Sequence, residues 1–206
     1  MNANDTLLLA TRSGGKLREL GPMLRTMGLD PVTLGELDIA LLPEEESVEA
    51  FDTFEENALA KARQAAAATG LPALADDSGL EVDALGGAPG VFSARYAGVG
   101  ATDAANNAKL LEALRDVPPA RRTARYRCVA AFVDPVRALE LTKAGACEGE
   151  LLASPRGAGG FGYDPLFVVP GRGLTMAEIA LDEKNRLSHR AAAFRALAVA
   201  LAAIRR

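Results

Sequence analysis

Apolar residues follow two different periods along this 206-residue chain, and their alternation is typical of an α/β protein. Short apolar runs bounded by glycine, proline or charged residues predict buried strands, which cover residues 6–11, 31–34, 72–75, 122–133 and 139–151. Apolar residues at helical spacing predict helices over residues 17–27, 53–68, 102–117 and 191–204. The last two strands are expected to pair antiparallel, and glycines at 145 and 149 are expected to break the second of them.

Local signals place some of the helix ends and faces. Thr53 and Glu56 have the spacing of a capping box, so a helix is expected to begin there, and Gly70 is expected to end it. One face of the last helix is predicted to belong to the core, and it carries Phe194, Leu197, Leu201 and Ile204.

The composition is that of an ordinary globular protein, with 49% hydrophobic and 24% charged residues. This length predicts a single domain over residues 1–206, either one large body or two small lobes. The formal net charge of −4 argues against broad binding to nucleic acid, and no apolar run reaches the ~20 residues that span a bilayer. Cys128 and Cys147 lack the spacing of metal ligands or of a disulfide framework, which indicates a reducing cytoplasm.

Two polar segments follow predicted strands, where α/β proteins often bind ligands. Arg12–Lys16 combines two glycines with a lysine before a helix, so its amides and Lys16 could bind phosphate; a plain strand-to-helix turn is the alternative. Asp76 and Asp77 stand at the predicted end of another strand. Adjacent carboxylates repel each other and need a cation, and Mg²⁺ is the usual one beside phosphate. A surface turn is the alternative for this pair.

Two further segments could contact a nucleotide. Residues 157–165 combine four glycines with Phe161 and Tyr163, which suits the approach and stacking of a flat base, although core packing of both rings is the simpler interpretation. Lys184, His189 and Arg190 place positive groups before a helix start, where they are unfavourable to the helix dipole unless an anion binds. His189 is the only histidine, which excludes a histidine-rich metal site.

Together these segments resemble the inosine triphosphate pyrophosphatase family, whose members remove deaminated purine nucleotides. The resemblance covers residues 7–197, and its most specific motifs are Thr53–Ala58, Ala75–Leu80, Gly159–Pro165 and Ser188–Arg190. It implies a long mixed β-sheet flanked by helices, two lobes with a central nucleotide cleft, and a homodimer. The implied reaction is Mg²⁺-dependent attack of water on the α-phosphorus of ITP, dITP or XTP, yielding a nucleoside monophosphate and pyrophosphate.

The resemblance also implies roles for individual residues. Asp77 corresponds to the proton acceptor and metal ligand, with Asp76 beside it and Ser78 at the substrate. A glutamate of the preceding acidic segment shares the metal, and Glu49 is the best match, ahead of Glu46. The triphosphate loop corresponds to Thr11, Arg12, Ser13, Gly14, Gly15 and Lys16, with Ser13 where the family has asparagine. The other nucleotide contacts correspond to Phe161, Gly162, Tyr163, Asp164, Lys184, His189 and Arg190.

The same resemblance suggests how charge and base are handled. Lys16 and Lys184 are expected to stabilise charge on the leaving pyrophosphate. Donors around Ser188–Arg190 are expected to read the oxo group at C6 of the purine. Two other functions remain open: hydrolysis of another modified nucleotide, pyrimidines included, and nucleotide sensing without turnover, which the serine at position 13 leaves possible.

Overall fold

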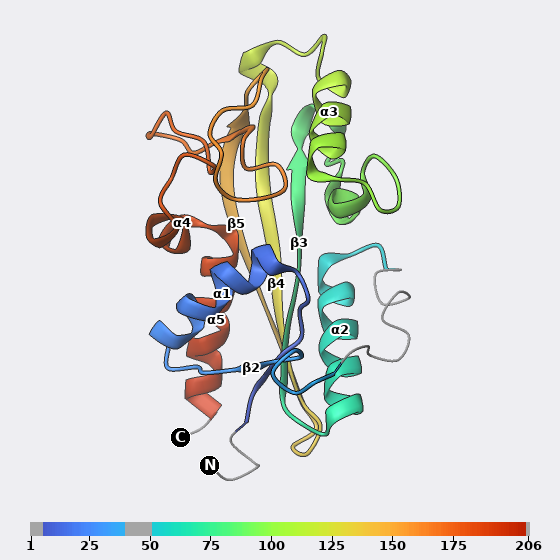
Figure 1. Cartoon of the computed structure of the whole chain (residues 1–206), viewed down its shortest axis with the longest axis vertical. Coiled ribbons are helices and arrows are strands. Elements are labelled where there is room, and N and C mark those ends of the chain that lie inside the picture. Colours follow the sequence, from blue (N-terminus) through green and yellow to red (C-terminus); the bar gives the residue numbers. More distant parts are fainter. Residues whose placement is uncertain (1–5, 40–50, 205–206) are drawn as a thin grey trace. The chain divides into compact units, whose positions relative to one another are not determined.

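A computed structural model describes residues 6–39 and 51–204, which form one sheet and its flanking helices (Figure 1). The strands are β1 (Leu8–Leu9), β2 (Val32–Thr33), β3 (Ala73–Val82), β4 (Thr123–Asp134), β5 (Leu139–Leu151) and β6 (Phe167–Val168). The helices are α1 (Gly14–Thr26), α2 (Phe54–Thr69), α3 (Asp103–Ala113), α4 (Leu181–Leu187) and α5 (His189–Ile204). No single helix among the described residues is long and apolar enough to cross a bilayer.

The six strands form a mixed sheet in the order β2-β1-β3-β4-β5-β6. β1 pairs parallel with both β2 and β3, whereas β5 and β6 pair antiparallel. The amide of Leu151 donates to the carbonyl of Arg122, while residues 135–138 join the other ends of β4 and β5, so this pair is antiparallel as well. The predicted α/β fold with a mixed sheet and flanking helices is therefore confirmed.

The chain divides into two compact units. Unit 1 comprises residues 1–77, 128–145 and 190–206, and unit 2 comprises residues 78–127 and 146–189. Strands β3, β4 and β5 each supply residues to both units. The division agrees with the two predicted lobes, whereas the nucleotide cleft stays a prediction.

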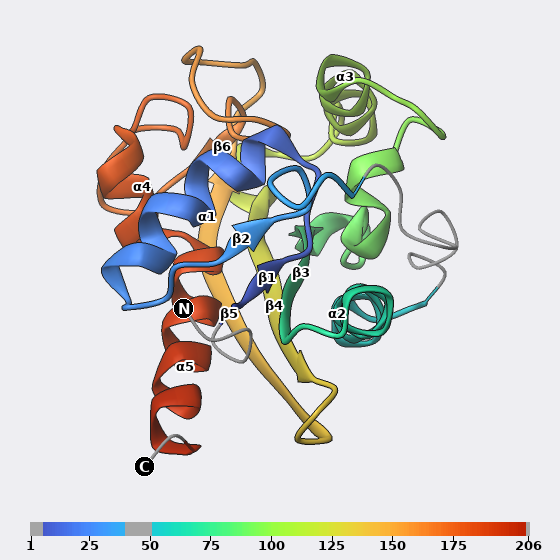
Figure 2. The same ribbon diagram turned by 60° about the horizontal axis from the view of Figure 1, so that its bottom comes forward.

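Unit 1 has a core on each face of its part of the sheet. On one face α1 and α5 pack together with side chains such as Leu9, Leu74 and Ala130 (Figure 2). On the other face α2 packs its alanines on Leu8, Ala73 and neighbouring side chains. Successive residues of a strand point to opposite faces, so Ala73 and Leu74 belong to different cores.

Unit 2 has a core of its own, to which α3 contributes Leu110 and its C-cap residue Leu114. These leucines pack with Leu80 and Val82 of β3 and with a buried group of residues further along the chain. That group consists of Ala124, Tyr126, Leu151, Tyr163, Leu166, Phe167, Val169, Met176 and Ile179.

The ends of α2 confirm the prediction from its caps. The Thr53 hydroxyl accepts from the Glu56 amide at 3.1 Å and donates to the Glu56 carboxylate at 2.7 Å. Gly70 ends the helix in the left-handed conformation, with φ of 69°, and its amide donates to the carbonyl of Ala66. The ends of α2 are therefore set by its own sequence.

Three local predictions are wrong. β3 does not end before Asp76 but continues to Val82, because buried side chains on both faces extend the strand beyond the carboxylates. β5 runs unbroken through glycines 145 and 149; a Cβ at Gly149 would lie 2.3 Å from the Phe167 ring, so this glycine admits β6 instead of breaking β5. Ile204 is 47% exposed, since it lies at the last turn of α5, beyond Leu201.

Candidate active site

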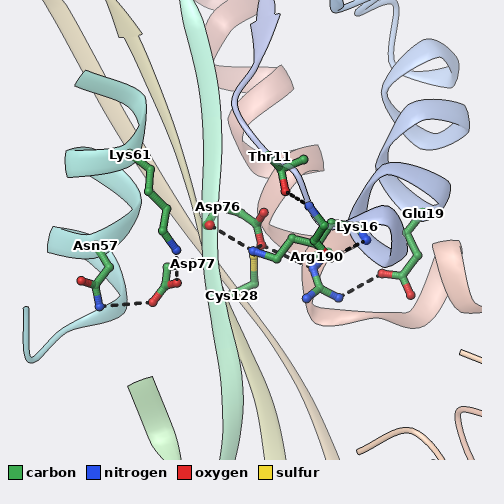
Figure 3. Close-up of polar contacts among 10 residues, drawn as sticks. Thr11, Lys16, Glu19, Asn57, Lys61, Asp76, Asp77, Cys128 and Arg190 are labelled. Carbon is green, nitrogen blue, oxygen red and sulfur yellow. Dashed lines mark hydrogen bonds and ion pairs between the residues drawn. The ribbon is translucent and has the colours of Figure 1, made fainter. Parts of the chain in front are cut away.

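Strand β3 directs two adjacent carboxylates to opposite faces of the sheet. Figure 3 shows the Asp77 side chain turned toward α2 and the Asp76 side chain turned toward α1 and α5. This follows the alternation of the strand, in which Leu74 belongs to the core under α1 and α5 and Ala75 to the core under α2. The expected repulsion within the pair is therefore relieved by separation, and each carboxylate has a lysine of its own.

Asp76 lies at the centre of a buried charge network in unit 1. Lys16 Nζ lies 2.9 Å from Asp76 Oδ2 and donates to the Asp76 carbonyl at 3.2 Å. Arg190 Nε lies 3.4 Å from the same Oδ2, and Arg190 Nη1 lies 3.0 Å from Glu19 Oε2. The Cys128 thiol lies 3.9 Å from this carboxylate and, with its pKa raised well above the usual value by burial, stays protonated.

These charges give Asp76 an unusually acidic carboxyl. Burial by itself would raise the pKa of Asp76, but the positive charges of Lys16 and Arg190 outweigh it and hold the pKa well below its usual value. Asp76 is therefore a permanent anion that fixes Lys16 and Arg190.

Asp77 has a different environment on the other face. Lys61 Nζ donates to Asp77 Oδ1 at 2.7 Å, and Asn57 Nδ2 donates to Asp77 Oδ2 at 3.3 Å. Burial raises the pKa of Asp77 above its usual value even though the Lys61 charge opposes the rise. Asn57 is itself held, since its side-chain amide exchanges two hydrogen bonds of 3.1 Å with the backbone of Phe51.

The predicted phosphate loop forms the start of α1. Ser13 is the N-cap of this helix, and its hydroxyl accepts from the Lys16 amide at 3.3 Å. The Thr11 hydroxyl accepts from the Ser13 amide at 3.3 Å, and Arg12 Nη1 donates to the carbonyl of Ile39 at 3.1 Å. The first amides of a 13-residue helix carry partial positive charge, and Gly14 and Gly15 belong to this first turn.

In unit 2 another buried carboxylate, Asp164, joins several of the predicted nucleotide contacts. Its Oδ2 accepts from Lys184 Nζ at 2.5 Å and from the Phe161 amide at 2.9 Å. Its Oδ1 accepts from the Tyr126 hydroxyl at 3.2 Å. Lys184 and Asp164 are both about 5% exposed, so this ion pair is shielded from water. A Cβ at Gly160 would lie 2.0 Å from Asp164 Oδ2, which explains the glycine there.

Aromatic rings order the same region of unit 2. The His189 ring stacks on Tyr126 at 4.7 Å between centroids with 12° between planes, and Lys184 Nζ lies 5.1 Å from the centre of the Phe161 ring. Tyr163 is a core residue whose hydroxyl donates to the Ser93 carbonyl at 2.8 Å. The alternative of core packing therefore holds for Tyr163, whereas Phe161 is only partly buried.

The Asp77 carboxylate keeps lone-pair sites that a cation such as Mg²⁺ could use. Its two oxygens accept one hydrogen bond each in the contacts above, and a carboxylate offers about four lone-pair sites. Mg²⁺ in phosphate sites is commonly held by one or two carboxylates. Among residues 6–39 and 51–204 no group of three or more Asp, Glu, His or Cys side chains could hold a metal ion. The predicted second ligand Glu49 and the runner-up Glu46 lie outside the described residues.

The sequence model of the Ham1 family matches residues 7–200 of the chain. The chain belongs to the Ham1 family. It is 53% identical over 192 residues to a dITP/XTP pyrophosphatase of Xanthomonas campestris, covering 93% of this chain and 94% of that one. It is 56% identical over 185 residues to a dITP/XTP pyrophosphatase of Geobacter sulfurreducens, covering 89% and 90%. The solved structure of a HAM1 protein from Coxiella burnetii, 43% identical, superposes with a TM-score of 0.82 over 96% of this chain and 98% of that one.

Within each unit of this Ham1 chain, the predicted site residues form clusters. Unit 1 brings Lys16, Arg190 and Asp76 into contact. Unit 2 brings Phe161, Asp164 and Lys184 into contact. Three residues do not stand before a helix as expected: Lys184 lies within α4, and His189 and Arg190 are the first residues of α5. Ser78 lies within β3, next to Asp77.

Four contributors to these clusters were absent from the sequence-based assignment. They are Asn57, Lys61, Glu19 and Tyr126. Asn57 and Lys61 stand four residues apart on α2, which places both on one face of the helix, but a capping or solvent-facing role was the preferred explanation of their polarity. Glu19 follows Lys16 by three residues on α1, a spacing that could have linked it to the charge network.

Proposed function

We propose that this Ham1-family protein hydrolyses noncanonical purine nucleoside triphosphates, namely ITP, dITP and XTP, to the nucleoside monophosphate and pyrophosphate. The observation that carries the proposal is the buried carboxylate of Asp77, which Lys61 and Asn57 orient and whose pKa burial raises. It stands in a chain more than half identical to two proteins named dITP/XTP pyrophosphatase.

Asp77 is the proton acceptor of the reaction. The oxygen of water forms a bond to the α-phosphorus, the bond from phosphorus to the bridging oxygen breaks, and its electron pair leaves with pyrophosphate. A proton of the water passes to the Asp77 carboxylate, which is a stronger base than an exposed aspartate because its pKa is raised. Lys61 and Asn57 hold the carboxylate in one orientation during this transfer.

The phosphate chain is assigned to Thr11–Lys16 in unit 1. The amides at the start of α1 and the Lys16 ammonium group are donors for phosphate oxygens. Lys184 is proposed to supply a second positive charge that stabilises the leaving pyrophosphate. Both lysines are paired with aspartates in the described structure, so substrate phosphate would compete with those carboxylates.

Mg²⁺ is the proposed cofactor, held by Asp77 and Glu49. When bound, it supplies positive charge that neutralises phosphate and lowers the pKa of a bound water. The purine base is assigned to two segments: Ser188, His189 and Arg190 as readers of the oxo group, and Phe161, Gly162, Tyr163 and Asp164 as the surrounding loop. Donors left unpaired by a wrong base can give ~10⁴-fold discrimination.

Pyrophosphate release measures this proposal directly. The parent and Asp77→Asn would be compared on ITP, dITP, XTP, ATP, GTP and the pyrimidine triphosphates, with and without Mg²⁺. We expect strong preference for ITP, dITP and XTP and loss of turnover in the variant. Equal turnover of ATP and GTP would refute the specificity, faster turnover of a pyrimidine triphosphate would favour the second enzyme function, and tight binding without turnover would favour a sensor.

We also propose that residues 1–206 act as one nucleotide pyrophosphatase domain, which works as a homodimer in the cytoplasm. Sedimentation velocity at micromolar concentration tests the dimer, for which a mass near twice 21.5 kDa is expected. A sedimenting species of single-chain mass would remove it.

A further inference from the structure

The loop of residues 160–164, here called the aromatic glycine loop, is held by hydrogen bonds from two side chains of α3. The Gly162 amide donates to Asp103 Oδ2 at 2.6 Å, and the Gly162 carbonyl accepts from Asn107 Nδ2 at 2.9 Å. Asp103 and Asn107 stand four residues apart, so both lie on one face of the helix. All three residues belong to unit 2. Both hydrogen-bonding groups of a single peptide residue are thus fixed from one helix.

Gly162 is the residue of this loop whose backbone most needs these two hydrogen bonds. Its φ is 62°, a left-handed conformation that glycine adopts without strain but that glycine also leaves easily. On either side the loop is fixed by other contacts: the Phe161 amide donates to Asp164, and the Tyr163 hydroxyl donates to Ser93. The two bonds from α3 restrain the flexible residue between these points, and with it the direction of the Phe161 ring.

The hydrogen bond from Asn107 to Gly162 also costs some folding stability. Asn107 must turn its amide nitrogen to Gly162, because a carbonyl can only accept. Its Oδ1 is consequently buried, and it accepts no hydrogen bond from the described residues. A buried polar atom without a partner is destabilising, so it offsets part of the stability that the bond to Gly162 contributes.

We propose that Asp103 and Asn107 are positioning residues of the nucleotide site, acting through Gly162 on the aromatic glycine loop. The proposal rests on the proposed function, because it takes Phe161 and its neighbours as nucleotide contacts. Neither Asp103 nor Asn107 needs to touch the substrate. Loosening the loop weakens binding of substrate and transition state alike, which raises KM and leaves kcat nearly unchanged.

Three variants separate positioning from general destabilisation of α3. Asp103→Ala removes the acceptor for the Gly162 amide, whereas Asp103→Asn keeps a side-chain oxygen and should restore the bond. Thr102→Ala is the matched control: the Thr102 hydroxyl caps the same helix through the Ala105 amide at 3.2 Å and does not contact Gly162 in the described structure. Thr102→Ala weakens α3 but leaves the hydrogen bonds from Asp103 and Asn107 to Gly162 intact.

The first measurement is kcat and KM for ITP in Mg²⁺, together with urea denaturation of every variant. Loss of one hydrogen bond, about 1 kcal/mol, corresponds to about a fivefold rise in KM for Asp103→Ala. Asp103→Asn and Thr102→Ala should stay within about twofold of the parent KM. Asn107→Leu removes the donor to the Gly162 carbonyl and should also raise KM by a few-fold with kcat nearly unchanged, a split that a purely structural role would not produce.

The second measurement, hydrogen exchange of the Gly162 amide without nucleotide, needs no activity. We expect Asp103→Ala to speed this exchange about fivefold and Thr102→Ala to leave it within twofold. An active parent whose KM is unchanged in Asp103→Ala, or rises equally in Thr102→Ala, would overturn the positioning role alone. A parent that neither binds nor hydrolyses ITP would overturn the proposed function, and the positioning role with it, whatever the exchange rates.

Discussion

Two adjacent aspartates of this protein have pKa values that are shifted in opposite directions. Asp76 meets two positive groups and has its pKa lowered, while Asp77 meets one and has its pKa raised by burial. The difference follows from the alternation of β3, which points the two side chains at different helices. At the scale of single residues, the backbone direction therefore decides which aspartate is suited to accept a proton.

Replacing Lys61 by methionine should inactivate the enzyme without unfolding it. The change keeps the length of the side chain but removes the ammonium group 2.7 Å from Asp77 Oδ1, so the carboxylate loses both its orientation and a balancing charge. We expect kcat/KM for ITP to fall ~100-fold or more. Lys143→Met, at an exposed lysine of β5, is the control and should leave kcat/KM unchanged. Equal losses in both variants would contradict the role of Lys61.

The lowered pKa of Asp76 predicts how stability depends on acid. A carboxyl with a lowered folded-state pKa stabilises the fold above its unfolded pKa of ~3.9, and this contribution is lost as pH falls through the folded-state value. In Asp76→Asn Lys16 and Arg190 lose this carboxylate, although Arg190 keeps Glu19, so the free energy of unfolding should fall by about 3–5 kcal/mol at pH 7. Urea denaturation with a chelator present should show this difference shrinking below pH 4. A difference independent of pH would contradict the assignment.

Tyr126→Phe removes only the hydroxyl group of this side chain and so tests its contribution alone. The ring can still stack on His189, but Asp164 Oδ1 loses its donor. We expect the free energy of unfolding to fall by about 1 kcal/mol and KM for ITP to rise a few-fold. Tyr96→Phe removes the hydroxyl of another tyrosine that packs against the same core, and as the control it should change both quantities less.

At the scale of elements, the residues that cap helix α2 lie directly before the residues of α2 that contact Asp77. Thr53 and Glu56 fix its first turn, and Asn57 and Lys61 follow within the next two turns. Thr53→Ala should lower the free energy of unfolding by about 1 kcal/mol. Urea denaturation measures this change, and Thr69→Ala, at the other end of α2, is a comparison that leaves the N-terminal cap intact.

The same elements show what sequence could and could not predict. The ends of α2 were predictable because capping is a local signal, written within a few residues of Thr53 and Gly70. The extent of β3 was not, because adjacent aspartates favour a turn and only tertiary partners, Lys16 and Lys61, make them acceptable inside a strand. The bond from Tyr126 to Asp164 joins residues 38 apart, and no local pattern indicates it.

At the scale of the whole molecule, each unit has its own hydrophobic core and its own buried ion pair. We therefore expect the fold of the described residues not to require a metal ion. Removing divalent metal with a chelator should abolish pyrophosphate release while leaving the thermal midpoint within about 2 °C, since Lys61 and Asn57 already hold Asp77. A large fall of the midpoint would show a structural metal instead.

The opposite directions of Asp76 and Asp77 have a consequence for folding. A slip of β3 by one residue would set Ala75 against Lys16 and Arg190, or Ser78 against Lys61, in place of a carboxylate. Either slip leaves a largely buried positive charge without its partner, at a cost of roughly 1–3 kcal/mol. The two aspartates thus specify the alignment of the central strand, and a sheet assembled out of register is disfavoured by the same charges to which we assign the chemistry.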